Sequence, residues 1–202
     1  MAERPILFST PMVRAILDGR KTQTRRIVKD IPLGYDFVGA SEDKTYLRAI
    51  TDKGRVLWTI DPRWHIGDIL WVRETWAIKP PIDPEQDWTT YFYKATYDLD
   101  GYDFKWKPPI FMPKDACRIK LRITDIRVER LQDISEGEAI AEGVVTNCCP
   151  IISETGSNEI FYNEGDYPTD HYQRLWESIN GKGSWDKNPF VWVITFERIT
   201  NP

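Results

Sequence analysis

Alternation of hydrophobic and polar positions predicts β-strands in several parts of the chain. The clearest segments are rich in β-branched and aromatic residues, and they are DILWVRETW at 68–76, CRIKLRITDI at 117–126 and FVWVITFERI at 190–199. Two weaker candidates are RVLWTI at 55–60 and YFYKATY at 91–97. Runs that contain proline and glycine separate these segments and are typical of loops.

Helical periodicity and capping signals predict three short helices. The first covers 10–19, where Thr10 can serve as the N-cap and apolar residues recur four positions apart. The second starts at Ser135, which forms an S-x-x-E capping box with Glu138. The third covers 170–181, in which apolar residues share one helix face before a closing glycine.

This set of elements predicts the fold class. Many strands with a few short helices indicate an α+β fold around a small, strongly bent sheet or barrel. No change of composition divides the chain into two cores, so we expect residues 1–202 to form a single domain. Loop-like segments near 30–55, 77–113 and 145–170 are then insertions within that domain.

Charge and hydropathy narrow the class of protein. The net charge is −4 and the pI calculated from the sequence is about 5.3, whereas proteins that coat nucleic acid without sequence preference are usually basic. A compact basic site on an acidic chain instead suits a small anionic or polar ligand. The chain has no run of 18 apolar residues and no signal-peptide core, so we expect a cytoplasmic protein with no membrane partner.

The cysteines do not indicate a disulfide framework or a metal site. There are three cysteines in all, and two of them, Cys148 and Cys149, are adjacent. The two histidines lie far from them in sequence, and the C-x-x-C spacing is missing. We therefore expect no metal and no cofactor.

A basic stretch, LDGRKTQTRRIVKD at 17–30, carries the first candidate chemistry. It can be a nucleic-acid patch, a solvated turn, or a lysine placed to activate a threonine. The third interpretation requires Lys21 to lose its proton near neutral pH. Burial and the neighbouring cations Arg20, Arg25 and Arg26 would both lower the pKa of Lys21.

Strand geometry limits this third interpretation. In a plain strand Lys21 and Thr24 would project from opposite faces, while Thr22 and Thr24 would share one face with Arg26. A turn or bulge is therefore needed to bring Lys21 and Thr24 together. On spacing alone, a solvated basic loop is the simpler interpretation.

The segment WVRETW contains a second constellation. Arg73 and Glu74 place two charges in an otherwise apolar strand. Glu74 shares a face with Trp76, and a carboxylate beside a flat ring could read the Watson–Crick edge of a stacked base. The alternative is a solvent-facing residue or a structural ion pair.

Four segments in a fixed order resemble the ASCH domain family, a relative of the PUA domain. They are GRKTQTRR, GDILWVRETW, VERLQDISEGEAIAEGV and LWESINGKGSWDKNPFVWVITFERI. Their order and spacing are similar to those of the longer ASCH proteins of phages and prophages. The resemblance implies a small PUA-like β-barrel flanked by short helices, with a cleft that suits a nucleoside.

The resemblance also implies an activity and its residues. Small bacterial ASCH proteins are amidohydrolases that remove the acyl group from N4-acetylcytidine and related N4-acylcytosines. Their site is a lysine, a threonine three residues later and a glutamate on the helix after a barrel strand. These match Lys21, Thr24 and Glu142, although Glu136 and Glu138 lie on the same short helix as Glu142.

These matches imply a mechanism of acyl transfer to water. Neutral Lys21 takes the proton of Thr24, which attacks the amide carbonyl and forms an acyl-enzyme. Glu142 orients Lys21 or holds the cytosine amine, and Arg26 hydrogen-bonds the base carbonyl or the developing oxyanion. Direct attack by water with Glu142 as the base stays open.

Further expectations concern the ligand. We expect Arg73, Glu74 and Trp76 to bind the substrate, which is a small nucleoside. The alternative is a PUA-like module that binds RNA or a nucleotide without catalysis, because another ASCH branch cleaves RNA and PUA relatives bind it. A third hypothesis is a phage accessory protein that kept the fold and lost the chemistry.

Overall fold

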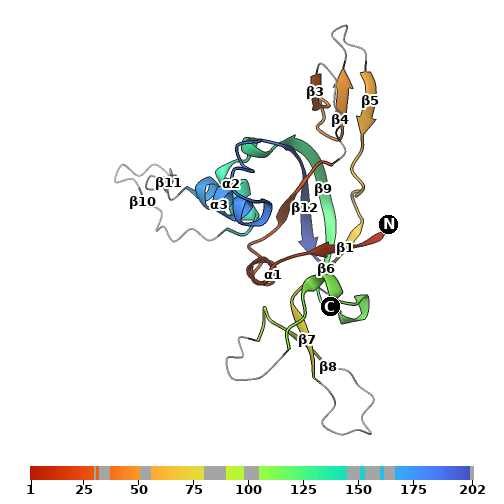
Figure 1. Ribbon diagram of the computed structural model, residues 1–202, viewed down its shortest axis with the longest axis vertical. Coiled ribbons are helices and arrows are strands. Elements are labelled where there is room, and N and C mark those ends of the chain that lie inside the picture. Colours follow the sequence, from red (N-terminus) through yellow and green to blue (C-terminus); the bar gives the residue numbers. More distant parts are fainter. Residues whose placement is uncertain are drawn as a thin grey trace. The chain divides into compact units, whose positions relative to one another are not determined.

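The computed structural model describes residues 1–29, 31, 37–50, 56–79, 90–97, 105–144, 151–152, 160–161 and 167–200. Most elements are strands and a few are short helices, which confirms the α+β prediction. In chain order (Figure 1) they are β1 (Glu3–Leu7), α1 (Thr10–Leu17), β2 (Gln23–Ile27), β3 (Phe37–Ala40), β4 (Leu47–Ile50), β5 (Val56–Ile60), β6 (Ile69–Arg73), β7 (Trp76–Lys79), β8 (Thr90–Tyr93), η1 (Pro109–Phe111), η2 (Lys114–Ala116), β9 (Lys120–Arg130), η3 (Leu131–Asp133), α2 (Glu136–Ala141), β10 (Ile151–Ile152), β11 (Ile160–Phe161), α3 (Pro168–Asn180) and β12 (Phe190–Arg198).

Each segment predicted as a strand overlaps a strand of the structure, although β9 begins at Lys120 and continues to Arg130 and β8 ends at Tyr93. The three clearest segments become β6, β9 and β12, and the two weaker candidates become β5 and β8. The prediction of one strand over 68–76 was wrong at its end, because β6 stops at Arg73 and β7 begins at Trp76. At this break the backbone N–H of Glu74 donates to Met112 Sδ instead of a strand partner.

The principal sheet has five strands in the order β1-β6-β9-β12-β2. β1 runs parallel to β6, and β2 pairs with β12 in the antiparallel direction. Over the ranges that the structure describes, this order ends at β1 and β2 and does not close into a barrel. Smaller sheets are formed by β3-β4-β5, by β7-β8 and by β10-β11. Parts of the predicted insertions, with Cys148 and Cys149, lie outside the described residues.

The chain divides into two compact units. The first contains 1–19, 65–124 and 196–202, and the second contains 20–64 and 125–195. The division falls inside β9 and inside β12, so both strands contribute residues to each unit. No helix of the described residues is long and apolar enough to cross a membrane.

In the second unit, α2 and α3 pack on one face of β12 (Figure 1). Val191 and Val193 alternate with Trp192 along β12, so the two valines point to the same face. They join Tyr172 and Trp176 of α3 in a buried cluster with Leu131, Ile134 and Ala139. The predicted apolar face of this helix included Ile179, but Ile179 lies in the last turn of α3 and is exposed.

The helix caps explain where the short helices begin and end. The capping box of α2 is confirmed, because Ser135 Oγ accepts from the Glu138 N–H and the Glu138 carboxylate accepts from the Ser135 N–H. Gly143 follows the helix with φ of +88°, a left-handed conformation that glycine adopts without strain. The N-cap of α1 is Ser9, one residue before the predicted Thr10.

We predict that Ser135→Ala lowers the free energy of unfolding by about 1 kcal/mol, because the Glu138 N–H in the first turn of α2 loses its Ser135 Oγ acceptor. Ser135→Asp is the matched control, since aspartate caps helices as well as serine does. Urea denaturation measures both variants. Equal destabilisation by the two substitutions would contradict a capping role.

Candidate active site

The start of β2 and the end of α2 are joined by backbone hydrogen bonding. The Thr22 N–H donates to the carbonyl of Ala141 at 2.9 Å, and this contact places Lys21 beside Glu142. Both residues belong to the second unit. Segments that lie 121 positions apart in sequence therefore form one site.

The Lys21 ammonium group is fully buried and has three oxygen partners. Lys21 Nζ lies 2.7 Å from Glu142 Oε2, 2.8 Å from the Glu142 carbonyl oxygen and 2.7 Å from the Gln23 carbonyl oxygen. An ammonium group has three N–H donors, so these bonds match its capacity. Glu142 is the C-cap of α2, and a cation is favoured at the carbonyl end of a helix.

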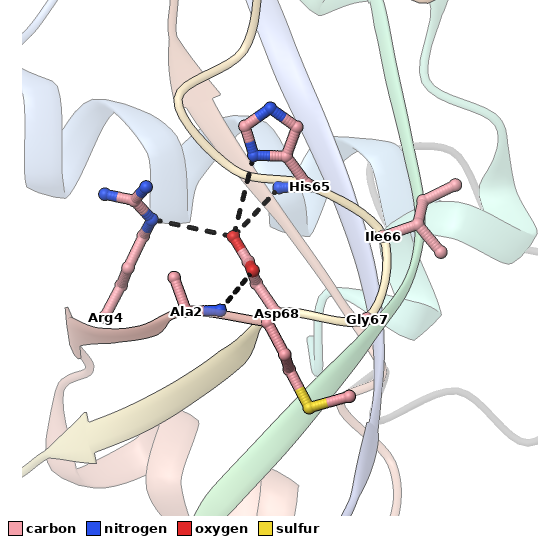
Figure 2. A pocket seen from close by; sticks show the side chains of 7 residues that line it. Ala2, Arg4, His65, Ile66, Gly67 and Asp68 are labelled. Atoms are coloured by element: carbon pink, nitrogen blue, oxygen red, sulfur yellow. Dashed lines mark hydrogen bonds and ion pairs between the residues drawn. The ribbon is translucent and has the colours of Figure 1, made fainter.

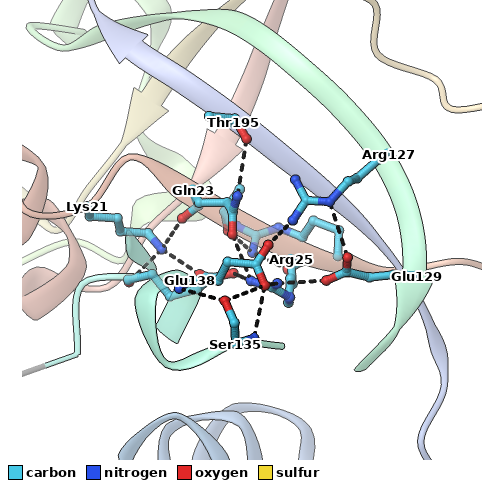
Figure 3. A network of polar contacts seen from close by, with 11 residues as sticks. Lys21, Gln23, Arg25, Arg127, Glu129, Ser135, Glu138 and Thr195 are labelled. Atoms are coloured by element: carbon cyan, nitrogen blue, oxygen red, sulfur yellow. Dashed lines mark hydrogen bonds and ion pairs between the residues drawn. The ribbon is translucent and has the colours of Figure 1, made fainter. Parts of the chain in front are cut away.

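Arg25 connects the Lys21–Glu142 pair to a larger network of charges (Figure 3). Its guanidinium lies 2.7 Å from Glu129, 3.3 Å from Glu138 and 3.4 Å from Glu142. Arg127 forms ion pairs with Glu129 and Glu138 as well. Cations and carboxylates thus pair throughout this network, and Arg127 extends it to Asp125 at 3.5 Å.

The pKa of Lys21 is lowered, as the sequence predicted. Its burial is the largest cause, and the charges of Arg26 and Arg25 lower the pKa further. The Glu142 carboxylate opposes this shift. Arg20 is exposed, and its guanidinium donates to the Gly143 carbonyl oxygen at 3.4 Å.

Tyr172 completes the surroundings of Glu142. Burial and the negative charge of Glu142 raise the pKa of the Tyr172 hydroxyl well above 10.0, and this hydroxyl donates a hydrogen bond to Glu142. The guanidinium of Arg25 also lies over the Tyr172 ring, 5.9 Å from its centroid. Tyr172 therefore acts as a fixed neutral donor to the carboxylate.

The positions of Lys21 and Thr24 bear on the turn or bulge that the sequence analysis required, and a meeting of their two side chains in one cleft stays a prediction. β2 begins at Gln23, so Lys21 precedes the strand and is not subject to its alternation. Its ammonium group bonds the carbonyl of the peptide that links Gln23 to Thr24. The buried Thr24 hydroxyl accepts a hydrogen bond from Arg26 Nη1 at 2.8 Å.

The two faces of β2 have different surroundings. Gln23 and Arg25 share the face that carries the charge network, and Thr24 and Arg26 share the other. Arg26 lies beside Trp192 in the antiparallel register with β12. Both residues line a cavity of about 450 Å³, together with Lys29, Asp61, Arg63 and Trp64. The Thr24 hydroxyl is therefore bonded to a side chain of this cavity.

The predicted substrate-binding group Arg73, Glu74 and Trp76 belongs to the first unit. The Glu74 carboxylate is buried and accepts from Arg118 Nε at 2.8 Å and from Arg118 Nη2 at 2.9 Å. Trp76 is buried in a cluster with Met112, and Arg73 donates to the Ile110 carbonyl. These contacts favour the structural ion pair among the alternatives for Glu74, and substrate binding by this group stays a prediction.

A second cavity, of about 460 Å³, surrounds Asp68 in the first unit (Figure 2). The Asp68 carboxylate accepts the Ala2 N–H at 2.7 Å and the His65 N–H at 3.2 Å, and it lies 3.6 Å from Arg4 Nε. The Ala2 hydrogen bond is the main cause of the lowered pKa of Asp68. A carboxylate held by these donors serves the fold rather than proton transfer.

Sequence reasoning missed the carboxylates that surround Arg25. Glu129 and Arg127 are two positions apart on β9, and the alternation of that strand indicates that they share a face. The sequence predicted Glu138 as the capping partner of Ser135 and as a competitor for the position of Glu142, but not as a partner of Arg25. Its role in the network follows from its contact with Arg25. Among the described residues no group of three metal-ligating side chains is placed to hold a metal ion.

Comparison with protein-family models, curated proteins and solved structures finds no match to this chain.

We predict that Glu142→Gln lowers the free energy of unfolding by about 3–5 kcal/mol, because it removes the carboxylate that pairs with buried Arg25 and with the protonated form of buried Lys21. Urea denaturation at neutral pH measures the loss. Glu197→Gln is the control, since the Glu197 carboxylate is exposed and pairs only at 3.4 Å with exposed Arg122. A loss no larger than that of the control would contradict the prediction.

The lowered pKa of Lys21 predicts how stability depends on pH. Between the folded pKa of Lys21 and its ordinary value of 10.5, the unfolded chain binds a proton that the folded chain does not. The free energy of unfolding therefore rises with pH across this interval. We expect the stability of the wild type relative to Lys21→Met to increase from neutral pH toward 10.5.

Urea denaturation at a series of pH values measures this difference. Lys187→Met is the matched control, because Lys187 is exposed and its variant should show no such slope. A relative stability that falls as the pH rises would indicate a raised pKa for Lys21 and would contradict the prediction.

Proposed function

We propose that this chain is an amidohydrolase that removes the acyl group from N4-acetylcytidine or related N4-acylcytosine nucleosides. One observation carries the proposal: a buried lysine with a lowered pKa bonds both Glu142 and the backbone next to a buried threonine. The segments GRKTQTRR and VERLQDISEGEAIAEGV resemble the ASCH family, and this resemblance supports Lys21, Thr24 and Glu142 as the catalytic residues. We also propose that this chain has the closed PUA-like barrel of that family.

The first step requires a neutral Lys21. Burial is the largest cause of the lowered pKa of Lys21, and the Glu142 carboxylate opposes it. Arg25 contacts the same carboxylate at 3.4 Å. Its positive charge lowers the pKa of Lys21 further and so partly offsets the effect of Glu142.

The nucleophile in this proposal is Thr24. Lys21 removes the hydroxyl proton, and Thr24 Oγ1 forms a bond to the carbonyl carbon of the acyl group. Arg26 already donates to Thr24 Oγ1, and a cationic donor favours the developing alkoxide over the hydroxyl. The tetrahedral intermediate collapses when the C–N bond breaks and Lys21 returns the proton to the cytosine N4 amine.

The second step restores the enzyme. Lys21 takes a proton from a water molecule, and the hydroxide attacks the acyl-threonine ester. The ester bond to Thr24 breaks, the carboxylic acid leaves and the threonine hydroxyl regains a proton. Glu142 holds Lys21 in place through both steps, and the Tyr172 hydroxyl holds Glu142.

A second candidate function is a module that binds a nucleotide or RNA without catalysis. The observation that favours it is the cationic lining of the cavity beside Arg26, which includes Lys29 and Arg63. In that case the Lys21–Glu142 pair has only a structural role. Binding of cytidine compounds without turnover of any acyl derivative would select this function.

We predict that the purified chain releases cytidine from N4-acetylcytidine and that Thr24→Ala lowers kcat/KM about 10³–10⁴-fold, as loss of a nucleophile does in acyl-transfer enzymes. Thr22→Ala is the matched control, because Thr22 is an exposed threonine two positions away. Chromatography of the products measures the rates. Full turnover by Thr24→Ala would reject the nucleophile and favour direct attack by water.

A further inference from the structure

The cavity beside Thr24 carries more positive charge than a neutral substrate needs. Its lining includes the cations of Arg26, Lys29 and Arg63 and the single carboxylate of Asp61, a net charge of +2. The whole chain has a net charge of −4. A local excess of cations on an acidic chain indicates that this cavity binds a ligand with an anionic group.

The aromatic walls position one of these cations. The Arg63 guanidinium lies over the Trp64 ring, 4.3 Å from its centroid, and Trp64 is buried. A guanidinium that stacks on a fixed ring loses less side-chain freedom when it binds. Its planar set of N–H donors matches two oxygens of a phosphate group.

Arg26 links this cavity to the proposed nucleophile. It lines the cavity and donates to Thr24 Oγ1 at 2.8 Å. A ligand in the cavity therefore lies next to the side chain that holds the threonine hydroxyl. The volume of about 450 Å³ is within the range of pockets that hold small molecules.

We infer that the substrate carries a phosphate on its sugar, so that it is an N4-acylcytidine nucleotide rather than the free nucleoside. Arg63 and Lys29 bind the phosphate, and Arg26 stays with Thr24. A phosphate monoester carries a charge of about −1.5 to −2 at neutral pH, which matches the net charge of the lining. The acidic chain disfavours a long RNA strand, which needs many cationic contacts. This inference rests on the proposed function.

Turnover of paired substrates tests the inference. We expect kcat/KM for the 5′- or 3′-monophosphate of N4-acetylcytidine to exceed that for N4-acetylcytidine by about 10–100-fold, because charge-assisted hydrogen bonds are added. Arg63→Gln and Lys29→Gln should each lower this preference about 10-fold. Lys187→Gln, an exposed lysine outside the lining, should leave the preference unchanged. Equal turnover of nucleotide and nucleoside would overturn the inference while the proposed function stands.

Binding measured without turnover tests the phosphate site independently of the proposed amidohydrolase activity. Isothermal calorimetry compares cytidine monophosphates, cytidine, inorganic phosphate and a cytidine-containing oligoribonucleotide. Tighter binding of a monophosphate than of cytidine, reduced in Arg63→Gln, supports the phosphate site even if no acyl group is released. Equal affinities for cytidine and its monophosphates overturn it. Preference for the oligoribonucleotide over the monophosphates also overturns it, because an RNA strand is then the ligand.

Discussion

The ion pair between Lys21 and Glu142 is the constraint on which the second unit depends. Two opposite charges are removed from water there, and such a pair is tolerated only when every donor and acceptor has a partner. The ammonium group is met by one carboxylate oxygen and two backbone carbonyls. Those carbonyls come from the end of α2 and the start of β2, so the pair determines how these two elements join.

The two faces of β2 separate structural charge from charge that is available to a ligand. On one face Arg25 is enclosed by Glu129, Glu138 and Glu142, so its charge is compensated within the protein. On the other face Arg26 contacts Thr24 and the cavity, where cations outnumber carboxylates. The alternation of a single strand thus places an ion-paired network against one side and a polar cavity against the other.

Glu74 and Arg118 in the first unit show why a buried ion pair is not by itself a catalytic site. Arg118 binds both oxygens of Glu74, and its guanidinium lies over the Tyr93 ring at 4.1 Å. An arginine keeps its proton at any physiological pH, so this pair stabilises the fold and cannot transfer a proton. Lys21 differs because burial lowers the pKa of its ammonium group.

The sequence alone determined the local elements, because alternation, capping boxes and glycines act over a few residues. It located β9, β12 and the α2 cap, and it named Lys21 as a residue whose pKa burial lowers. Only the tertiary structure decided which partners the charged residues have. At the break after Arg73 the Glu74 N–H donates to Met112 Sδ, and the contact of Lys21 with Glu142 spans 121 positions. Such pairings depend on strand register and helix packing, and no local pattern encodes the distance between two side chains from remote segments.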